Sequence, residues 1–172
     1  SSQPAMAAVD QNGNVKAIAP GKLAITVTTE SGKSASCNLL VGLRKGDVIT
    51  NGIYRYKVTN TMVDGSGEVE VIGFVKGRSA KKVSIPKSVA WNGIKYNVTS
   101  VGTRAFIKNK KIRNIVIPDS VRKIRHKAFY ACPNVKKLTI GKNVSFMGAH
   151  AFCLNKKLEK IVFRGTKLKQ LR

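Results

Sequence analysis

The chain has 172 residues and a formal net charge of +24, from 32 lysines and arginines against eight aspartates and glutamates. Its length allows one large or two small domains, and it contains no apolar run of the roughly 18 residues that a membrane-spanning helix needs. Residues 98–172 hold nineteen basic and two acidic residues, which favours anionic partners and says nothing about the fold. The chain starts at Ser1 without a signal peptide, so we expect a mature fragment of a longer protein.

Residues 1–42 predict short β-strands separated by turns. Met6–Val9 and Val15–Ala19 flank a turn whose Gly13 suits positive φ. Two further strands alternate apolar residues with small or polar ones, so each has one apolar face. These two faces consist of Leu23, Ile25 and Val27 and of Cys37, Leu39 and Val41. We expect all six side chains to be covered.

The segment resembles the second half of a bacterial immunoglobulin-like domain of group 2. The matching residues are Ser2-Gln3-Pro4-Ala5, Val9-Asp10-x-x-Gly13-x-Val15-x-Ala17 and Pro20-Gly21. The resemblance implies part of a β-sandwich, of the kind that serves as a spacer or adhesive module in extracellular proteins. Because the other half is absent, we expect the open faces to be completed by a second copy, by a missing segment or by packing on the cap.

Residues 43–97 predict a linker, a β-hairpin cap and a degenerate first repeat. Gly42–Thr50 is typical of a linker. Ile53–Thr59 and Val69–Val75 alternate in hydropathy on either side of the turn Asp64-Gly65-Ser66-Gly67, which predicts an antiparallel hairpin. Such a hairpin would cover the open end of a repeat array, where the first coil otherwise exposes its core and strand edge.

A second hairpin is predicted at Asn92-Gly93, a dipeptide typical of two-residue turns. Trp91 and Tyr96 are expected near the tip of this projection. There they either contact a ligand or pack on the neighbouring coil, and the residues alone leave both interpretations open.

Residues 98–172 contain three copies of a 23-residue repeat, which begin at Val98, Val121 and Val144. Each copy has an Ala-Phe pair followed by apolar residues spaced as in a short strand. The repeated positions are Phe106, Phe129 and Phe152; Ile115, Leu138 and Ile161; and Ile117, Ile140 and Phe163. A fixed period of this size predicts a solenoid, with strands stacked about 4.8 Å apart. We therefore expect the six strand residues to be buried and the three rings to form a spine. The alternative, two amphipathic helices per repeat, is disfavoured by the β-branched residues and by Pro118.

The repeat resembles the BspA-type (Treponema-type) leucine-rich repeat, through V-x-x-I-G-x-x-A-F, then Cys or Asn, then L-x-x-L-x-I-P-x-S. The resemblance implies a mainly β fold: a right-handed solenoid with short helical turns and a concave parallel sheet, found in bacterial surface and secreted proteins. This chain has Arg125 where the family has glycine, and Asn109 and Asn155 where it has the cysteine kept at Cys132. Val83 and Ile85 continue the pattern at an offset of 32, as a degenerate first copy.

No set of residues predicts catalysis. His126 and His150 occupy different repeat positions, and no Ser-His-Asp order, carboxylate pair or phosphate loop stands out. Cys37, Cys132 and Cys153 lack metal-ligand spacing, and we expect all three to be reduced and buried. We therefore expect no metal, no cofactor and no enzymatic activity.

The candidate binding residues lie between the apolar strand positions, on the expected concave face. They are Arg113, Lys136, Lys137, Thr139 and Lys160. They predict either an ordinary solvated face or a groove for a polyanion such as teichoic acid or a sulfated glycan. Nucleic acid is less favoured because few aromatic residues interleave with the basic ones. We expect an extracellular or cell-surface adhesion module that binds a protein or wall polymer, or else a structural stalk.

Overall fold

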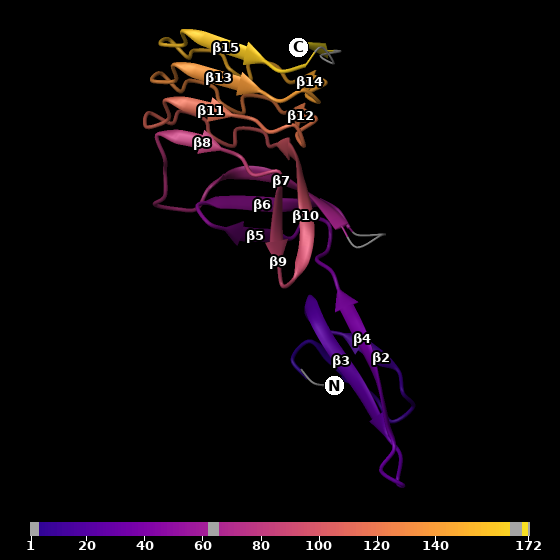
Figure 1. The fold of residues 1–172 in the computed structure, drawn as a ribbon. Helices are drawn as coiled ribbons and strands as arrows, with labels where there is room; N and C mark the ends of the chain where they lie inside the picture. Colours follow the sequence, from indigo (N-terminus) through magenta and orange to yellow (C-terminus); the bar gives the residue numbers. More distant parts are fainter. Residues whose placement is uncertain (1–3, 62–65, 166–169, 172) are drawn as a thin grey trace.

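The computed structural model describes residues 4–61, 66–165 and 170–171, and this part of the chain contains β-strands and turns but no helix. Turns stand where short helical turns were expected. The described residues accordingly include no helix long and apolar enough to cross a membrane. Two N-terminal hairpins extend from one end of a stack of coils, and the C-terminus lies at the other end (Figure 1).

The N-terminal part consists of two antiparallel hairpins. β1 (Ala7–Val9) pairs with β2 (Val15–Ala17), and β3 (Gly21–Thr28) pairs with β4 (Ser34–Val41). The turn between β1 and β2 is held by Asp10, whose carboxylate accepts hydrogen bonds from the backbone N–H groups of Asn12 and Asn14. The predicted strands are therefore present.

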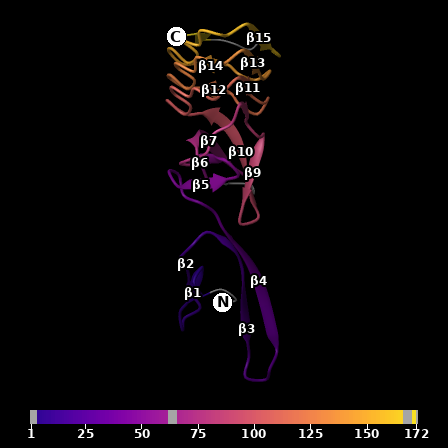
Figure 2. The ribbon, with the colours of Figure 1, turned by 90° about the vertical axis from the view of Figure 1, so that its left-hand side faces the viewer.

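The expectation that six apolar side chains of β3 and β4 are covered is met only in part. Leu23 is buried, and Ile25, Leu39 and Val41 are half-buried. Val27 is 65% exposed and Cys37 is also exposed. The expectation was wrong for these two. The tip of the β3–β4 hairpin extends past β1 and β2 (Figure 2), which leaves Val27 near that tip uncovered.

The cap has three strands. β5 (Val48–Asn51) pairs with β6 (Tyr54–Asn60), which pairs in turn with β7 (Ser66–Phe74), both in the antiparallel sense. The hairpin was predicted, but β5 begins inside the segment assigned to a linker. The cap also contacts the strand at residues 82–84, because the backbone N–H of Ser84 donates a hydrogen bond to the Tyr54 hydroxyl at 3.1 Å.

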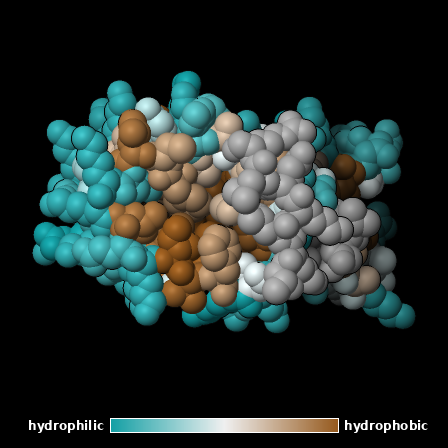
Figure 3. Space-filling model, turned by 90° about the horizontal axis from the view of Figure 1, so that it is seen from above, coloured by the Kyte–Doolittle hydropathy of each residue, from teal (hydrophilic) through white to brown (hydrophobic). Residues whose placement is uncertain are grey.

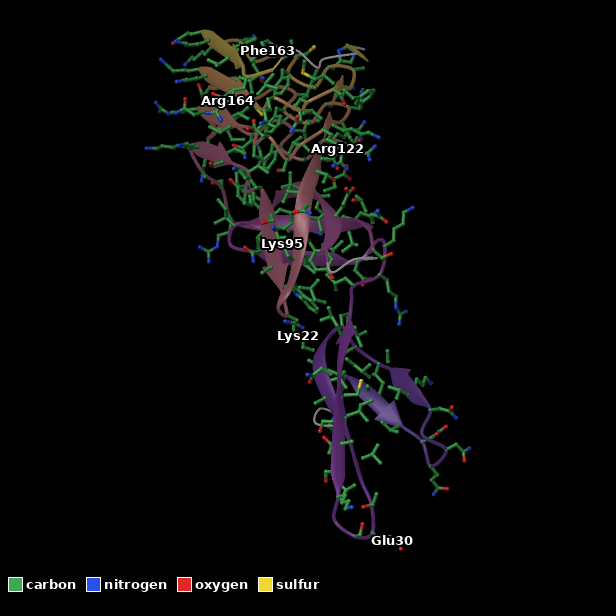
Figure 4. All side chains as sticks on the ribbon, turned by 45° about the vertical axis from the view of Figure 1, so that its right-hand side comes forward. Lys22, Glu30, Lys95, Arg122, Phe163 and Arg164 are labelled. Carbon is green, nitrogen blue, oxygen red and sulfur yellow. The ribbon has the colours of Figure 1, made fainter. Side chains whose placement is uncertain are left out.

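The second hairpin is formed by β9 (Ser88–Trp91) and β10 (Ile94–Val101), with Asn92 and Gly93 both at positive φ in the turn. Its tip meets the N-terminal part, where Asn92 Nδ2 donates to the carbonyl of Pro20 at 3.2 Å. The side chain of Lys22 passes beside Gly93 at this tip (Figure 4).

The two aromatic residues of this hairpin differ in how far they are buried. Tyr96 is 0% exposed, and its hydroxyl accepts a hydrogen bond from the backbone N–H of Leu43 at 3.0 Å. Trp91 is half-buried against the core. Tyr96 therefore packs inside the fold, because β10 pairs with β7 in an eight-stranded sheet instead of projecting from it, and Trp91 packs against the core with part of its side chain.

The coils each contribute one strand to each of two sheets. The first sheet contains β8 (Lys82–Ser84), β11 (Asn114–Val116), β13 (Lys137–Ile140) and β15 (Lys160–Phe163), all parallel. In the second, β10 is followed by β12 (Lys123–Ile124), β14 (Phe146–Met147) and β16 (Gln170–Leu171), also in parallel register. The parallel pairing and the register of 23 between successive coils match the predicted solenoid.

The predicted aromatic spine is confirmed. The rings of Phe106 and Phe129 stack with centroids 5.0 Å apart, and those of Phe129 and Phe152 with centroids 5.4 Å apart. The spine continues into the cap through Phe74, 5.0 Å from Phe106, and Tyr54, 5.5 Å from Phe74. Phe74 precedes Phe106 by 32 residues, the offset already seen for Val83, so the sequence contained a signal for it.

Burial of the six strand residues is confirmed for Ile115, Ile117, Leu138 and Ile140 and is wrong for the last coil. Ile161 is 49% exposed and Phe163 is 52% exposed, because β15 is the outermost strand of its sheet. Seen from this end, apolar side chains form a patch left of the centre, with hydrophilic ones along the outer edge beside it (Figure 3).

The three cysteines were expected to be buried, and this is confirmed only for Cys132. All three thiols are free, but Cys37 and Cys153 are exposed. Cys132 is buried, its thiol donates to the carbonyl of Phe106 at 3.1 Å, and burial raises its pKa to about 11. Asn155, at the cysteine position of the next coil, accepts the backbone N–H of Cys132 at 2.9 Å.

Candidate functional site: a basic wall along the solenoid

Ten lysines and arginines lie where the chain enters the strands of the first sheet, and all ten are exposed. We call this surface the basic wall: Lys81, Lys82, Lys110, Lys111, Arg113, Lys136, Lys137, Lys156, Lys157 and Lys160. Glu159 is the one acidic residue that lies in the same loops and strand ends. The fold therefore gathers about a third of the chain's positive charge on one side of the coils.

Backbone pairing stacks these side chains in columns. Lys82, Asn114, Lys137 and Lys160 occupy one continuous rung position across β8, β11, β13 and β15. A neighbouring column contains Lys81, Arg113 and Lys136, joined by backbone hydrogen bonds. The N–H of Lys136 donates to the carbonyl of Arg113 at 2.7 Å, and the N–H of Arg113 donates to the carbonyl of Lys81 at 2.7 Å. Adjacent strands lie about 4.8 Å apart, so cations follow one another along each column at that interval, except where Asn114 interrupts the first column and Glu159 ends the second.

The wall is hollowed at its first coils. Lys81, Lys110, Lys111 and Arg113, together with Ser79 and Ala80, border an open depression of about 510 Å³. Asn134 Nδ2 donates to the carbonyl of Lys110 at 2.8 Å and ties this loop to the next coil. Four cations therefore surround a space large enough for a charged group and part of the chain that carries it.

The structure places four of the five predicted binding residues on the wall: Arg113, Lys136, Lys137 and Lys160. Thr139 is only 7% exposed, because it lies between the half-buried Val116 and Val162 on its rung. Lys136 is engaged with Glu159, whose Oε1 lies 3.2 Å from its Nζ. The remaining lysines were missed, although Lys110 and Lys111 precede Lys156 and Lys157 by two repeats of 23 residues.

Two acidic residues of the cap lie away from the wall, beside the second sheet. Arg122 Nη2 is 2.7 Å from Glu68 Oε1, and Arg125 pairs with Glu70. Glu68 and Glu70 belong to β7 of the cap, so these ion pairs join the cap to the second coil. The pair with Glu70 also gives a reason for the departure at Arg125, where the family has glycine.

The two histidines, which the repeat alignment separates, are neighbours in space. The rings of His126 and His150 have centroids 6.1 Å apart, and His150 Nδ1 is 3.5 Å from the exposed Cys153 thiol. Among the described residues, no group of three or more histidines, cysteines or carboxylates is arranged to hold a metal ion.

The family of the BspA type leucine rich repeat region matches residues 74–171 in six copies, and the group 2 bacterial Ig-like domain matches residues 1–39. Curated proteins give no match.

Three solved structures of similar fold come from longer chains, of which this chain spans well under half. A leucine-rich repeat protein from Bacteroides ovatus is 30% identical with a TM-score of 0.58, over 66% of this chain and 28% of that one. A leucine rich cell surface protein from Faecalibacterium prausnitzii is 26% identical with a TM-score of 0.56, over 67% of this chain and 30% of that one. The pneumococcal vaccine antigen PcpA shares the fold at 22% identity and a TM-score of 0.51, over 73% of this chain and 40% of that one.

Proposed function

Because the chain belongs to the BspA-type leucine-rich repeat family, we propose that it is a non-catalytic adhesion module of a bacterial surface or secreted protein, and that its basic wall binds an anionic polymer. The observation that carries the proposal is the stacking of ten exposed cations on successive coils against a single acidic residue. Like charges placed this close repel one another, and a bound polyanion relieves the repulsion.

The form of the wall favours an extended ligand. Strands lie about 4.8 Å apart, and at least one wall cation stands at the start of each, so a chain that lies across the strands meets a cation at every coil. All ten wall residues are lysine or arginine, whose charged groups suit phosphate, sulfate or carboxylate oxygens. No aromatic side chain belongs to the wall, so stacking on nucleic-acid bases is not implied.

An extracellular setting is supported by the F. prausnitzii protein, which is described as a cell surface protein, and by the group 2 bacterial Ig-like match. A wall teichoic acid or a sulfated host glycan has the required chemistry, and an acidic protein surface would meet the same cations.

A structural stalk is the second candidate function. The observation that favours it is the extended arrangement of the N-terminal hairpins beyond the solenoid (Figure 1), joined to it by the contact between Asn92 and Pro20. A stalk displays another domain and needs no ligand of its own. A measurement of polyanion binding therefore distinguishes the two functions.

Heparin is a suitable probe for that measurement. If four wall cations engage it, the logarithm of the binding constant falls with the logarithm of salt concentration with a slope of about −3 to −4. Replacement of Lys82, Lys137 and Lys160 by glutamate removes three stacked cations that have no ion-pair partner among the described residues. We expect most of the affinity and most of the slope to be lost.

The matched control carries glutamate at Lys16, Lys33 and Lys95, which are exposed and lie outside the wall. It changes the net charge by the same amount and should retain most of the binding. Equal losses in both variants would show that only net charge matters. Absence of binding to heparin and to teichoic acid at low salt would leave the stalk.

A further inference from the structure

A second hollow, of about 510 Å³, lies beside the second sheet and has a chemistry opposite to that of the basic wall. It is formed where β7 and β10 of the first coils meet the turns that lead into β12 and β14. Its principal side chains are Glu68, Asn97, Asp119, Arg122, Asn143 and Ser145. Arg122 marks its position at the junction of β10 with the coils (Figure 4).

Every residue that lines the hollow has a polar or charged side chain, although carbon atoms of these side chains make up part of its surface. Two carboxylates and one guanidinium give the hollow a net charge of about −1 in a chain of charge +24. Amide and hydroxyl groups make up the rest. A polyanion is therefore not favoured here, whereas a ligand that both donates and accepts hydrogen bonds is.

Several of these groups are already held in place. Glu68 Oε2 accepts a hydrogen bond from Thr99 Oγ1 at 3.3 Å, in addition to its ion pair with Arg122. Asp119 Oδ1 accepts the backbone N–H of Lys142 at 2.9 Å. Asn143 Nδ2 donates to the carbonyl of Asp119 at 2.8 Å. Side chains fixed in this way lose little conformational freedom when a ligand binds.

The same groups keep hydrogen-bonding capacity. Asp119 Oδ2 and Asn143 Oδ1 are acceptors with no protein partner among the described residues, and the Asn97 amide is likewise uncommitted there. Arg122 uses one nitrogen for Glu68, and its side chain is 51% exposed. Acceptors and donors thus face one open space from successive coils.

We infer that this hollow binds a neutral saccharide. Each sugar hydroxyl both donates and accepts, so adjacent hydroxyls fit between the carboxylate of Asp119 and the amide of Asn143, with Arg122 and Asn97 supplying donors. A volume of about 510 Å³ is ample for one or two sugar rings. No aromatic ring lines the hollow to stack on a sugar face, so the affinity is weak. This site is independent of the polyanion site proposed above.

The test titrates isotope-labelled protein with neutral oligosaccharides of glucose, galactose, mannose or N-acetylglucosamine and follows the side-chain amide signals by NMR. At least one oligosaccharide should shift the signals of Asn97 and Asn143, with a dissociation constant in the millimolar range. Asp119→Asn retains the shape of the side chain and should weaken binding by roughly tenfold, as a hydrogen bond to a charged acceptor is lost. Asn143→Ala should do the same, and the exposed Asn38→Ala on β4 should change nothing.

Heparin binding separates the two proposals. Asp119→Asn should bind heparin like the unaltered chain, and the wall variant with glutamate at Lys82, Lys137 and Lys160 should bind the oligosaccharide normally. If no neutral oligosaccharide shifts the two amides, or if Asp119→Asn binds as well as the unaltered chain, the saccharide site is refuted. Loss of saccharide binding in the wall variant would also refute it, because the sugar would then be bound at the wall.

Discussion

The second and third coils of the solenoid have equivalent residues at equivalent positions but differ in what covers them. Leu138 and Ile140 of the second coil are 1% and 2% exposed, whereas Ile161 and Phe163 of the third are 49% and 52% exposed. Their strands are paired in the same register, and their phenylalanines belong to the same spine. A repeat therefore specifies the shape of a coil, while its neighbours supply most of the burial that stabilises it.

The aromatic spine should show this difference most strongly. Phe129 has a stacked ring on both sides and is fully buried, whereas Phe152 is stacked on Phe129 and only half-buried. Phe129→Ala should lower the free energy of unfolding by about 3–5 kcal/mol, and Phe152→Ala by about half as much. Denaturant unfolding of the two variants measures this, and equal costs would mean that cover from neighbours does not matter.

The thiols give the next largest contrast. Below pH 9, a pKa raised from 9.0 to about 11 leaves Cys132 with about a hundredfold less thiolate than an unperturbed cysteine, and the thiolate is the reactive form. Cys132 is also buried, whereas Cys153 in the next coil is exposed. A thiol reagent should therefore label Cys37 and Cys153 quickly in the native chain, and Cys132 only on unfolding or as the pH approaches 11. Rapid labelling of three thiols in the native chain at neutral pH would contradict this.

A smaller effect is expected where the cap meets the second coil. Arg125→Gly restores the residue of the other coils and removes the partner of Glu70, whose side chain is only 13% exposed. The Arg125 side chain is 45% exposed, so solvent screens the pair, and we expect a loss of about 1 kcal/mol. A double-mutant cycle with Glu70→Gln isolates the pair from other effects of each substitution. A coupling energy of zero would show that Arg125 is there for another reason.

The smallest effect concerns the backbone, which should not distinguish the coils. Ala131 and Leu154 occupy the same repeat position and have φ of 55° and 60°. An L-residue pays about 1–2 kcal/mol for this conformation, and glycine avoids most of that while losing about 0.5–1 kcal/mol of chain entropy. Ala131→Gly and Leu154→Gly should each raise the melting temperature slightly and to a similar degree. Destabilisation by either would mean that its side chain matters more than its φ.

The two candidate sites differed in how far they could be predicted. The wall was partly visible, because columns of lysine and arginine recur with the repeat; Arg113, Lys136, Lys137 and Lys160 were found, and Lys82 was not. The polar hollow could not be predicted, because its side chains come from four separate segments: β7, β10 and the turns before β12 and β14. These segments are spread over residues 68–145. Thr139 was assigned to the binding surface by alternation alone, and only the packing of its neighbours shows that it is buried.

The 23-residue period by itself determined the stacked parallel strands, the buried isoleucines of the inner coils and the phenylalanine spine, because each coil can bury its apolar side only against another coil. The Asn92-Gly93 turn was likewise determined locally, by the positive φ that these residues tolerate. Only the tertiary structure decided the burial of Tyr96, the pairing of Glu70 with Arg125, the exposure of Cys153 and the meeting of Glu68, Asp119 and Asn143. These features depend on which segments lie side by side. Each such contact occurs once in the fold, so it does not recur with the repeat and cannot be recognised from a period in the sequence.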